Sequence, residues 1–339
     1  MKTGILFPGQ GSQQLRMLHD LVRHPAVDET LSEVSAVLDL DVRTLDTPEG
    51  LQSAVSVQLA ILTAGVATAR ALQRRGFAPL AVAGLSVGAF SAAVAADSIS
   101  LSDAVRLVRS RAEQMEQMYP VGYGLSAIVG LTEAQVAKLV DAVNTKEHPV
   151  FVGNINAPRQ IVVAGSNEGM EQVLEKARSR GARKAEQLDV LVPSHCSLLQ
   201  PVADSLRNQL QSISVRDPKP IYLANVDARA VRSAQGVAKD LADNIAHGVR
   251  WHDATTVACE LVASYCSKFH PGTFSLTWPE RTCKGFKLVR SPPGHSIDSS
   301  ILRGADNWGK VLRSTWTCVE ARLSNDLRSN ALNSMPARN

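Results

Sequence analysis

The chain has 339 residues, 45% hydrophobic and 20% charged, so it is long enough to bury one large core or two ordinary ones. Of its net charge of +4, residues 263–339 carry +6, so residues 1–262 carry −2 and give no case for a nucleic-acid-binding surface. No run of eighteen apolar residues occurs and the N-terminus enters a strand pattern at once, so we expect a cytoplasmic protein without a membrane span.

The first predicted element is a short strand over residues 4–7, which leads into the loop Pro8-Gly9-Gln10-Gly11. This loop contains a G-x-G sequence, but the third glycine of a dinucleotide-binding G-x-G-x-x-G would fall on Gln14. We therefore interpret the segment as a glycine loop whose backbone N–H groups face an active site. A plain strand-to-helix turn is the alternative.

The pattern Gly84-Leu85-Ser86-Val87-Gly88 is a G-x-S-x-G motif between a predicted strand and an alanine-rich helix. Strand, tight turn and helix form the context in which this motif becomes a nucleophile elbow. The sequence thus indicates Ser86 as a nucleophile, and a plain Gly-Ser turn is the alternative because the motif is short. The elements predicted around it are helices over residues 28–38, 55–73 and 89–96 and a strand over residues 80–83.

Ser102 is predicted to cap the next helix, which runs to about Met118 and carries three arginines. Arg106 and Arg109 share one face of this helix, whereas Arg111 lies on another, so the arginines do not form a single basic stripe. From the pattern alone, each of them is interpreted as a solvated surface side chain.

From residue 121 onward the pattern changes to strand, helix, strand, strand, helix and strand, the order of a ferredoxin-like split βαβ unit. We therefore predict an inserted ferredoxin-like subdomain at residues 121–192. Its predicted strands cover residues 125–129, 149–152, 160–164 and 185–190, and its helices cover residues 132–143 and 166–181.

Pro193-Ser194-His195-Cys196 follows the last of these strands, where the chain returns to the large domain. Clefts concentrate between domains, and a histidine there can be neutral at pH 7 and accept a proton, so His195 is a catalytic candidate. A hydrogen-bonded loop histidine is the alternative. Cys196 is interpreted as a small buried residue and not as a nucleophile. A strand over residues 220–224 and a helix over residues 238–245 are predicted next.

No metal site and no bound cofactor are predicted. His247 and His252 lack the helical spacing of metal ligands, and the chain contains no H-E-x-x-H motif. The five cysteines include no C-x-x-C pair, so neither a zinc site nor a disulfide framework is indicated.

Taken together, five motifs resemble the malonyl-CoA:acyl-carrier-protein transacylases, and the resemblance runs from residue 1 to about residue 261. The motifs are Phe7-Pro-Gly-Gln-Gly-Ser-Gln13, Gly84-Leu-Ser-Val-Gly88, Leu107-Val-Arg-Ser-Arg-Ala-Glu-Gln-Met115, Asn154-Ile-Asn-Ala157 with Ile161-Val-Val-Ala-Gly165, and Val192-Pro-Ser-His-Cys196. General transacylases have His before the nucleophile and Leu-Gly-Glu after it, where this chain has Leu85 and Val87-Gly88-Ala89. That departure resembles the malonyltransferase (epsilon) subunit of malonate decarboxylase.

The resemblance implies an α/β fold: an α/β-hydrolase-like large domain with a parallel sheet and a nucleophile elbow, plus the ferredoxin-like insert. The large domain would comprise residues 1–120 and 193–262, and the insert residues 121–192. Residues 263–339 depart from the family and would form a divergent tail. This tail holds three of the five cysteines and three of the four tryptophans, and we hypothesise a shifted reading frame or another C-terminal divergence.

The resemblance also implies the role of each site residue. Ser86 would take the malonyl group from malonyl-CoA as an ester, and His195 would remove the proton first from Ser86 and then from the incoming thiol. The backbone N–H groups of Gln10 and Val87 would form the oxyanion hole. Arg111 would bind the free carboxylate of the malonyl group and so favour malonyl over acetyl.

In this family a main-chain carbonyl, here within residues 244–248, orients the histidine, so an acidic third member is not needed. The family has Asn where His247 stands in this chain. The acceptor would be the phosphopantetheine-type thiol of an acyl carrier protein or of the malonate decarboxylase carrier subunit, and the sequence does not choose between these two partners.

Two other functions stay open. A serine (thio)esterase would use the same elbow, with Asp189 as the acidic residue nearest to His195 in the sequence. A catalytically inactive assembly subunit would account for the unusual tail. Arg111 and a dry cleft favour acyl transfer over hydrolysis.

Overall fold

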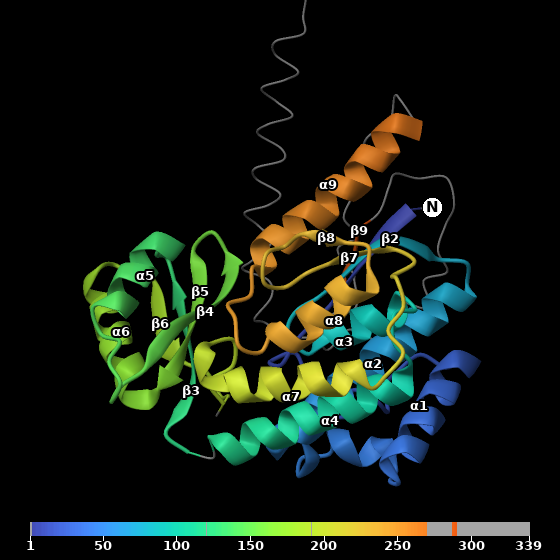
Figure 1. Cartoon of the computed structure of the whole chain (residues 1–339), viewed down its shortest axis with the longest axis horizontal. Coiled ribbons are helices and arrows are strands. Elements are labelled where there is room, and N and C mark those ends of the chain that lie inside the picture. Colours follow the sequence, from blue (N-terminus) through green and yellow to red (C-terminus); the bar gives the residue numbers. More distant parts are fainter. Residues whose placement is uncertain (1, 120, 191, 270–286, 290–339) are drawn as a thin grey trace, which may run out of the picture. The chain divides into compact units, whose positions relative to one another are not determined.

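The computed structural model describes residues 2–119, 121–190, 192–269 and 287–289, all of which belong to one compact unit, Met1–Trp308 (Figure 1). The strands described there form a five-stranded sheet and a four-stranded sheet. The chain is therefore a mixed α/β protein.

The five-stranded sheet has the order β8-β7-β2-β1-β9. Its three central strands run parallel, and the strand at each edge is antiparallel to its neighbour. Parallel strands place their carboxyl ends at one edge of a sheet, so the loops after β1 and β2 lie together. The strands are β1 (Lys2–Phe7), β2 (Ala78–Gly84), β7 (Ile221–Leu223), β8 (Ala230–Val231) and β9 (Lys287–Val289).

Helices surround this sheet, and α4 and α7 lie side by side (Figure 1). Within the described chain the α-helices of this part are α1 (Pro25–Leu38), α2 (Ala54–Arg74), α3 (Gly88–Ala95), α4 (Leu101–Met118), α7 (Gln200–Gln211), α8 (Ala234–Asp243) and α9 (Trp251–Phe269). Short 3-10 helices cover Val42–Asp46, Gly50–Gln52 and Ser197–Leu199.

Helix α2 matches the prediction of a long buried helix. By length and composition alone it could cross a membrane, but 78% of its most apolar window is buried within the protein. Ser53 caps its N-terminus by accepting hydrogen bonds from the backbone N–H groups of Val55 and Ser56. Helix α2 is therefore a core helix of this domain.

Two helix starts differ from the prediction. Ser100, and not Ser102, caps α4, because its hydroxyl accepts the N–H of Asp103 and the buried Leu101 becomes the first helical residue. Helix α8 begins at Ala234, four residues before its predicted start. The side chain of Ser233 caps it and accepts the N–H of Gly236.

The four-stranded sheet is antiparallel with the order β4-β5-β3-β6, and α5 and α6 cover one of its faces (Figure 1). The succession of its elements is the predicted one. Strand β6 is shorter than predicted, because the backbone turns at residues 188–190, where the N–H of Val190 donates to the carbonyl of Leu188. The elements are β3 (Tyr123–Val129), α5 (Glu133–Asp141), β4 (Val150–Ala157), β5 (Gln160–Ser166), α6 (Asn167–Ser179) and β6 (Lys184–Gln187).

A short backbone bridge joins β4 to the segment before α9. The N–H of Ile155 donates to the carbonyl of Val249 at 2.8 Å, and the N–H of Val249 donates to the carbonyl of Gly153 at 2.7 Å. The hydroxyl of Tyr119 also donates to the carbonyl of Leu198, on the loop that leaves the insert. These bonds attach β4 and the residue after α4 to segments that follow the four-stranded sheet in the chain.

The boundary predicted after residue 262 falls inside α9, which continues to Phe269. Strand β9 lies within the predicted tail and pairs antiparallel with β1, with Gly4 opposite Val289. The rest of the predicted tail, residues 270–286 and 290–339, lies outside the described residues.

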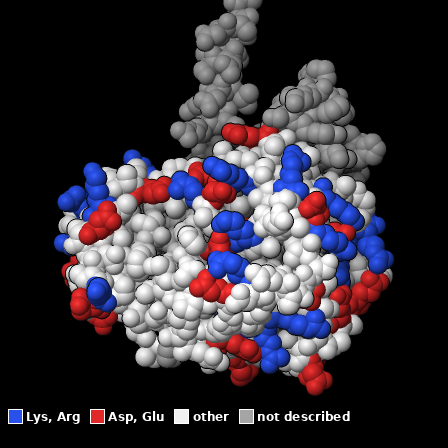
Figure 2. Space-filling view, in the orientation of Figure 1, with Lys and Arg blue, Asp and Glu red and all other residues white. Residues whose placement is uncertain are grey.

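On the face drawn in Figure 2, lysine and arginine side chains are interspersed with aspartate and glutamate. This mixture agrees with the small net charge of the first 262 residues.

Candidate active site

Ser86 lies in the tight turn between β2 and α3. Its φ of +55° is in the left-handed region, and its side chain is buried. Both flanking glycines are required by close backbone approaches. A Cβ on Gly84 would lie 2.0 Å from the carbonyl oxygen of Gly88, and one on Gly88 would lie 2.5 Å from that of Pro8. The G-x-S-x-G motif therefore forms a sharp strand-turn-helix elbow with the serine at its tip.

The glycine loop after β1 lies against this elbow. The N–H of Leu85 donates to the carbonyl of Phe7 at 3.0 Å, and a Cβ on Gly9 would lie 2.6 Å from the carbonyl oxygen of Leu85. Within the described residues, the backbone N–H groups of Gln10 and Val87 donate to no protein acceptor. In this respect both amides meet the requirement for oxyanion-hole donors, which must be free of protein acceptors.

Arg111 reaches Ser86 from α4 and is 1% exposed. Its Nη1 donates to the side-chain oxygen of Gln58, and its Nη2 donates to the Ser86 hydroxyl at 3.1 Å. In the described part of the chain its Nε has no partner and no carboxylate pairs with the guanidinium. Burial lowers the pKa of Arg111 to about 9. The site thus contains a buried cation without an anion.

His195 lies on the loop between β6 and α7 with a φ of +68° and is 3% exposed. Its Nδ1 lies 2.6 Å from the carbonyl oxygen of Asn244, inside the segment from which the resemblance implies an orienting carbonyl. A carbonyl only accepts hydrogen bonds, so Nδ1 carries the hydrogen and Nε2 is the free acceptor. Burial, together with the charge of Arg111, lowers the pKa of His195 to about 3. His195 is therefore neutral at pH 7.

Arg111 connects the other two side chains of the site: it donates to Ser86, and its charge acts on His195. The three residues come from α4, from the turn after β2 and from the loop after β6. By contrast, Asp189 is exposed and His247 binds the carbonyl of Asp243 through Nδ1. The partner of His195 Nδ1 is thus a carbonyl and not an acidic side chain.

Two polar residues of the site were not among the predicted ones. Gln58 holds Arg111, and its signal in the sequence is an amide inside the otherwise apolar stretch of residues 57–62 in helix α2. Asn225 accepts the backbone N–H of Ser86 through Oδ1 at 3.0 Å. It follows β7, 139 positions from Ser86, and no local pattern links the two.

Cys196 is buried beside His195, and its Sγ donates to the carbonyl of Pro193 at 3.2 Å. Burial raises the pKa of its thiol to about 12. A thiol that stays protonated is a poor nucleophile, which agrees with the interpretation of Cys196 as a small buried residue.

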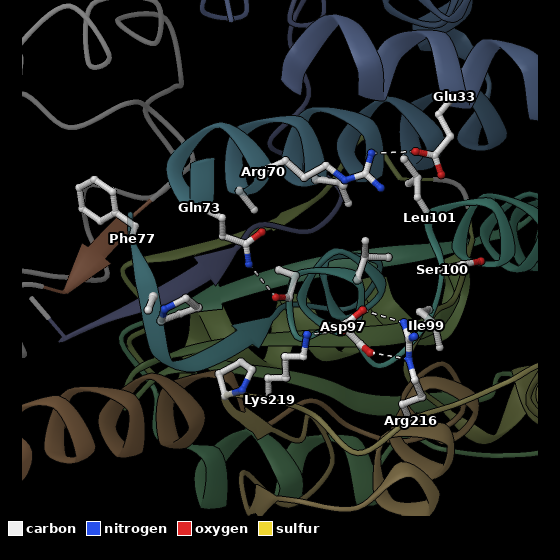
Figure 3. A pocket seen from close by; sticks show the side chains of 17 residues that line it. Glu33, Arg70, Gln73, Phe77, Asp97, Ile99, Ser100, Leu101, Arg216 and Lys219 are labelled. Atoms are coloured by element: carbon white, nitrogen blue, oxygen red, sulfur yellow. Dashed lines mark hydrogen bonds and ion pairs between the residues drawn. The ribbon is translucent and has the colours of Figure 1, made fainter. Parts of the chain in front are cut away.

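A separate cavity of about 830 Å³ lies at the amino end of β2, where Ala78 and Pro79 line it (Figure 3). Figure 3 shows Asp97 in this cavity between Arg216 and Lys219, each 2.6 Å away. The elbow follows the opposite end of β2, so this cavity is not the site around Ser86. Among the residues that the structure describes, no three histidines, cysteines or carboxylates lie close enough to hold a metal ion.

The fold and the site together fit one class of protein, an α/β acyltransferase. Comparison with known proteins leads to the same class. Residues 5–271 match the family model described as the acyl transferase domain, and the chain belongs to this family.

Its relatives carry more specific names. The malonyl CoA-acyl carrier protein transacylase of Salmonella typhimurium is 37% identical over 76% of this chain and 84% of its own length. The protein of the same name from Escherichia coli K12 is 38% identical over 73% of this chain and 81% of its own length.

Solved structures agree with these relatives. An acyl-carrier-protein S-malonyltransferase from Burkholderia pseudomallei has a TM-score of 0.71 and 37% identity, and covers 77% of this chain and 85% of its own. A malonyl-transacylase in complex with its type II PKS acyl-carrier protein has a TM-score of 0.71 and 36% identity, and covers 77% of this chain and 84% of its own.

Proposed function

We propose that this protein moves a malonyl group from malonyl-CoA, through an ester on Ser86, to the thiol of an acyl carrier protein. The observation that carries the proposal is Arg111, a buried guanidinium beside Ser86 that has no carboxylate partner in the described chain. A substrate with a free carboxylate next to its thioester would supply that partner.

The geometry of Arg111 suits such a carboxylate. Gln58 fixes Nη1, which leaves Nε and Nη2 on the opposite edge of the guanidinium. These two N–H groups are parallel and can bind both oxygens of one carboxylate. Nη2 would then exchange its hydrogen bond to Ser86 for one to the substrate, which frees the hydroxyl for attack.

Acylation starts when Ser86 Oγ attacks the thioester carbonyl carbon and His195 Nε2 takes the hydroxyl proton. The N–H groups of Gln10 and Val87 would hold the oxyanion of the tetrahedral intermediate, a contribution of roughly 3–4 kcal/mol per donor in acyl-transfer enzymes. Its collapse breaks the carbon–sulfur bond, and the departing coenzyme A thiolate takes the proton from His195.

The second half-reaction reverses these steps. His195 removes the proton of the carrier thiol, the sulfur attacks the ester carbon, and Ser86 leaves and regains its proton from His195. An acetyl group would leave the guanidinium of Arg111 buried and unpaired, so acetyl-CoA would be a poor donor.

The finer fold assignments belong to the same proposal. Parallel strands β1, β2 and β7 and the elbow support an α/β-hydrolase-like large domain of residues 1–120 and 193–262. The order β4-β5-β3-β6 with two helices supports a ferredoxin-like insert at residues 121–192. The proposed mechanism needs no metal and no bound cofactor, and we place the reaction in the cytoplasm.

The test is the intact mass of the protein after brief exposure to malonyl-CoA, with Ser86→Ala as the control. We expect a gain of one malonyl group in the wild type and none in the variant, and loss of that group when a phosphopantetheinylated carrier is added. Release of free malonate without a carrier would favour the (thio)esterase. No gain in a folded protein would favour the inactive subunit.

A second comparison concerns the acceptor. The alternative acceptor is the carrier subunit of malonate decarboxylase, because Leu85 and Ala89 depart from the general transacylase pattern around Ser86. The malonyl-enzyme should then transfer faster to that subunit than to a general acyl carrier protein. The named relatives and the complex with an acyl-carrier protein support the general carrier instead. Faster transfer to the general carrier would remove the decarboxylase role.

A further inference from the structure

The backbone N–H of Ser86 is bound by the protein itself. It donates to Oδ1 of Asn225 at 3.0 Å, in a contact that is fully buried. Ser86 has a left-handed backbone, which a residue other than glycine adopts only when its surroundings hold it there. Asn225 is thus a side chain from a distant part of the chain that bonds the strained residue directly.

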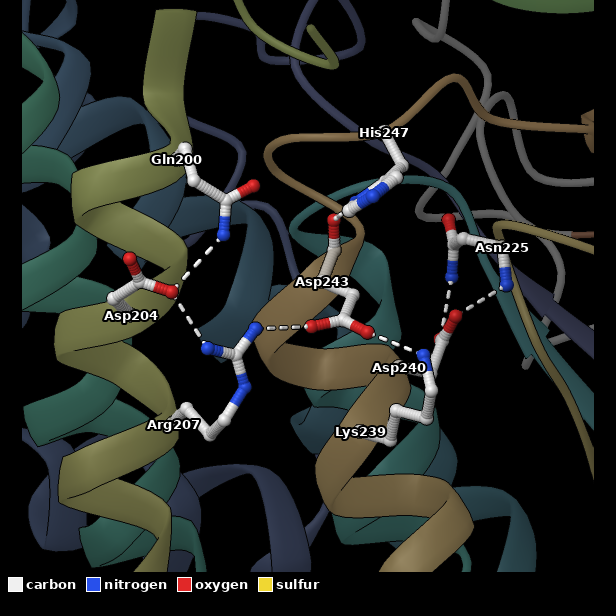
Figure 4. A network of polar contacts seen from close by, with 8 residues as sticks. All are labelled: Gln200, Asp204, Arg207, Asn225, Lys239, Asp240, Asp243 and His247. Atoms are coloured by element: carbon white, nitrogen blue, oxygen red, sulfur yellow. Dashed lines mark hydrogen bonds and ion pairs between the residues drawn. The ribbon is translucent and has the colours of Figure 1, made fainter. Parts of the chain in front are cut away.

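Asp240 on α8 fixes the orientation of Asn225 (Figure 4). The backbone N–H of Asn225 donates to one carboxylate oxygen of Asp240 at 2.7 Å, and its Nδ2 donates to the other at 3.0 Å. Tyr222 donates its hydroxyl to the same carboxylate at 2.7 Å. An ionised carboxylate only accepts, so the Nδ2 of Asn225 must face Asp240 and its Oδ1 must face Ser86.

This network is closed to water. Tyr222, Asn225 and Asp240 are each at most 4% exposed. Burial raises the pKa of Asp240, whereas the hydrogen bonds from Tyr222 and Asn225 act in the opposite direction. A buried carboxylate is stable only when its hydrogen bonds are satisfied. The bonds that satisfy Asp240 therefore also hold Asn225 rigidly in position.

We propose that Asn225, anchored by Asp240 and Tyr222, is the positioning residue of the nucleophile. It holds Ser86 in its left-handed conformation so that Oγ points at Arg111. It also occupies the Ser86 N–H, which leaves the amides of Gln10 and Val87 as the oxyanion donors. The inference rests on the proposed role of Ser86. None of the sequence motifs and none of the predicted roles includes this network.

The test compares single-turnover acylation by malonyl-CoA in the wild type and in Asn225→Ala, followed by rapid quench and intact mass. We expect the acylation rate constant to fall about 100-fold while the dissociation constant of malonyl-CoA stays within about threefold, since a small misplacement of a reacting atom has an effect of that size. An unchanged acylation rate in Asn225→Ala would overturn the proposal.

Asp243 provides a matched control on the same helix. Figure 4 shows its carboxylate between Arg207 and Lys239, whereas the carboxylate of Asp240 faces Asn225. Asp243→Asn should lower the melting temperature but leave the acylation rate constant unchanged. If both variants slow acylation in proportion to their loss of stability, Asn225 has a merely structural role and the proposal is wrong.

Asn225→Asp should change the pH dependence of acylation, which a merely structural role of Asn225 would not do. It keeps an oxygen for the Ser86 N–H but places two carboxyl groups together, and their mutual repulsion raises the pKa at which they lose the proton they share. Between about pH 5 and pH 8, acylation by this variant should therefore fall as the pH rises, while the wild type stays flat. A flat profile for the variant contradicts the proposal.

Two further measurements keep the outcomes separate. Tyr222→Phe removes one hydrogen bond to Asp240 and preserves the ring, so it tests the network if Asn225→Ala does not fold. We expect acylation by Tyr222→Phe to slow several-fold.

A fluorophosphonate probe labels an activated serine without malonyl-CoA. Slower labelling of Asn225→Ala supports the positioning role even if malonyl is the wrong substrate, and equal labelling overturns it.

Discussion

At the scale of single residues, Arg111 is a fully buried cation held by Gln58 and by the hydroxyl of Ser86. Arg111→Lys replaces a planar fork with a single ammonium group, which cannot bind both oxygens of a carboxylate and cannot reach Gln58 in the same way. We expect kcat/KM for malonyl-CoA to fall roughly 100-fold or more, and that for acetyl-CoA to change far less. Initial rates with the two donors measure this.

Arg109 on the same helix is the control for this substitution. Its side chain is half exposed and pairs with Glu113 at 2.8 Å. Surface pairs of this kind contribute about 0–1 kcal/mol, so Arg109→Lys should leave both rates unchanged. Equal losses for malonyl-CoA and acetyl-CoA in Arg111→Lys would mean that Arg111 does not recognise the carboxylate.

The pH dependence of acylation follows from His195 and Arg111. The pKa of His195 is lowered to about 3, so His195 stays neutral, and acylation should show no loss between about pH 8 and pH 5 where an ordinary histidine would titrate. The pKa of Arg111 is lowered to about 9, so its charge, and with it malonyl binding, should be lost as the pH rises through 9. Single-turnover acylation rates measured across this pH range test both expectations. A fall in the rate as the pH drops through about 6.5 would contradict the lowered pKa of His195.

The same shift has a consequence for stability. The unfolded chain takes up a proton on His195 near pH 6.5, whereas the folded protein does so only near pH 3. The free energy of unfolding should therefore fall as the pH drops through this window, and the contribution of His195 is fully present only above pH 6.5.

The sequence located the residues whose signal is local and missed those whose signal is not. Ser86 stands inside a short motif, and His195 stands on a loop between predicted domains, so both could be named in advance. Arg111 had the pattern of a surface arginine, and only the family resemblance assigned it to the site. Asn225 and Asp240 act through a hydrogen bond between distant segments, which no periodicity reveals.

At the scale of elements, the elbow depends on two glycines. A Cβ on Gly84 would lie 2.0 Å from the carbonyl oxygen of Gly88, which is backbone and cannot move aside. Gly84→Ala should therefore lower the free energy of unfolding by roughly 3 kcal/mol or more and abolish acylation. Urea unfolding measures the first effect and intact mass the second.

Gly153 on β4 is the matched control for the elbow. A Cβ there would meet its nearest atoms at 3.5 Å, an ordinary contact. Gly153→Ala should fold and acylate like the wild type. If Gly84→Ala were as stable as Gly153→Ala, the turn would not be the tight one described here.

Helices and strands could be predicted in kind and order, but their ends could not. Helix ends depend on which hydroxyl reaches an N–H, and both Ser100 and Ser102 precede the same amphipathic pattern. Ser100 forms the cap because Leu101, the residue after it, is buried as the first residue of the helix. Likewise, the helix predicted from residue 238 starts at Ala234, because Ser233 caps a turn that the apolar periodicity does not include.

At the scale of the whole molecule, Arg111, whose charge no carboxylate of the described residues pairs, couples substrate binding to stability. A ligand that binds only the folded state at one hundred times its dissociation constant stabilises a protein by about 2.7 kcal/mol. In Ser86→Ala, which cannot form the ester, malonyl-CoA should raise the melting temperature by several degrees. Acetyl-CoA at the same concentration should raise it much less, and equal shifts would show that coenzyme A alone provides the binding energy.

The arrangement of the large sheet could not be read from the sequence. Alternation of strands and helices indicates parallel strands, but it does not say that β1 lies between β2 and β9 or that β9 runs antiparallel to it. Strand β9 has three residues outside the range 5–271 that the family model matches, and so short a run carries no pattern of its own.

The position of β1 has a consequence for synthesis. β1 leaves the ribosome before its two neighbours, which are β2, at residues 78–84, and β9, at residues 287–289. At about 5–20 residues per second, roughly 15–60 s pass before the second neighbour is made. During that time one edge of β1 presents free N–H and C=O groups to other nascent chains. Newly made protein is therefore most exposed to aggregation before its last described strand has emerged.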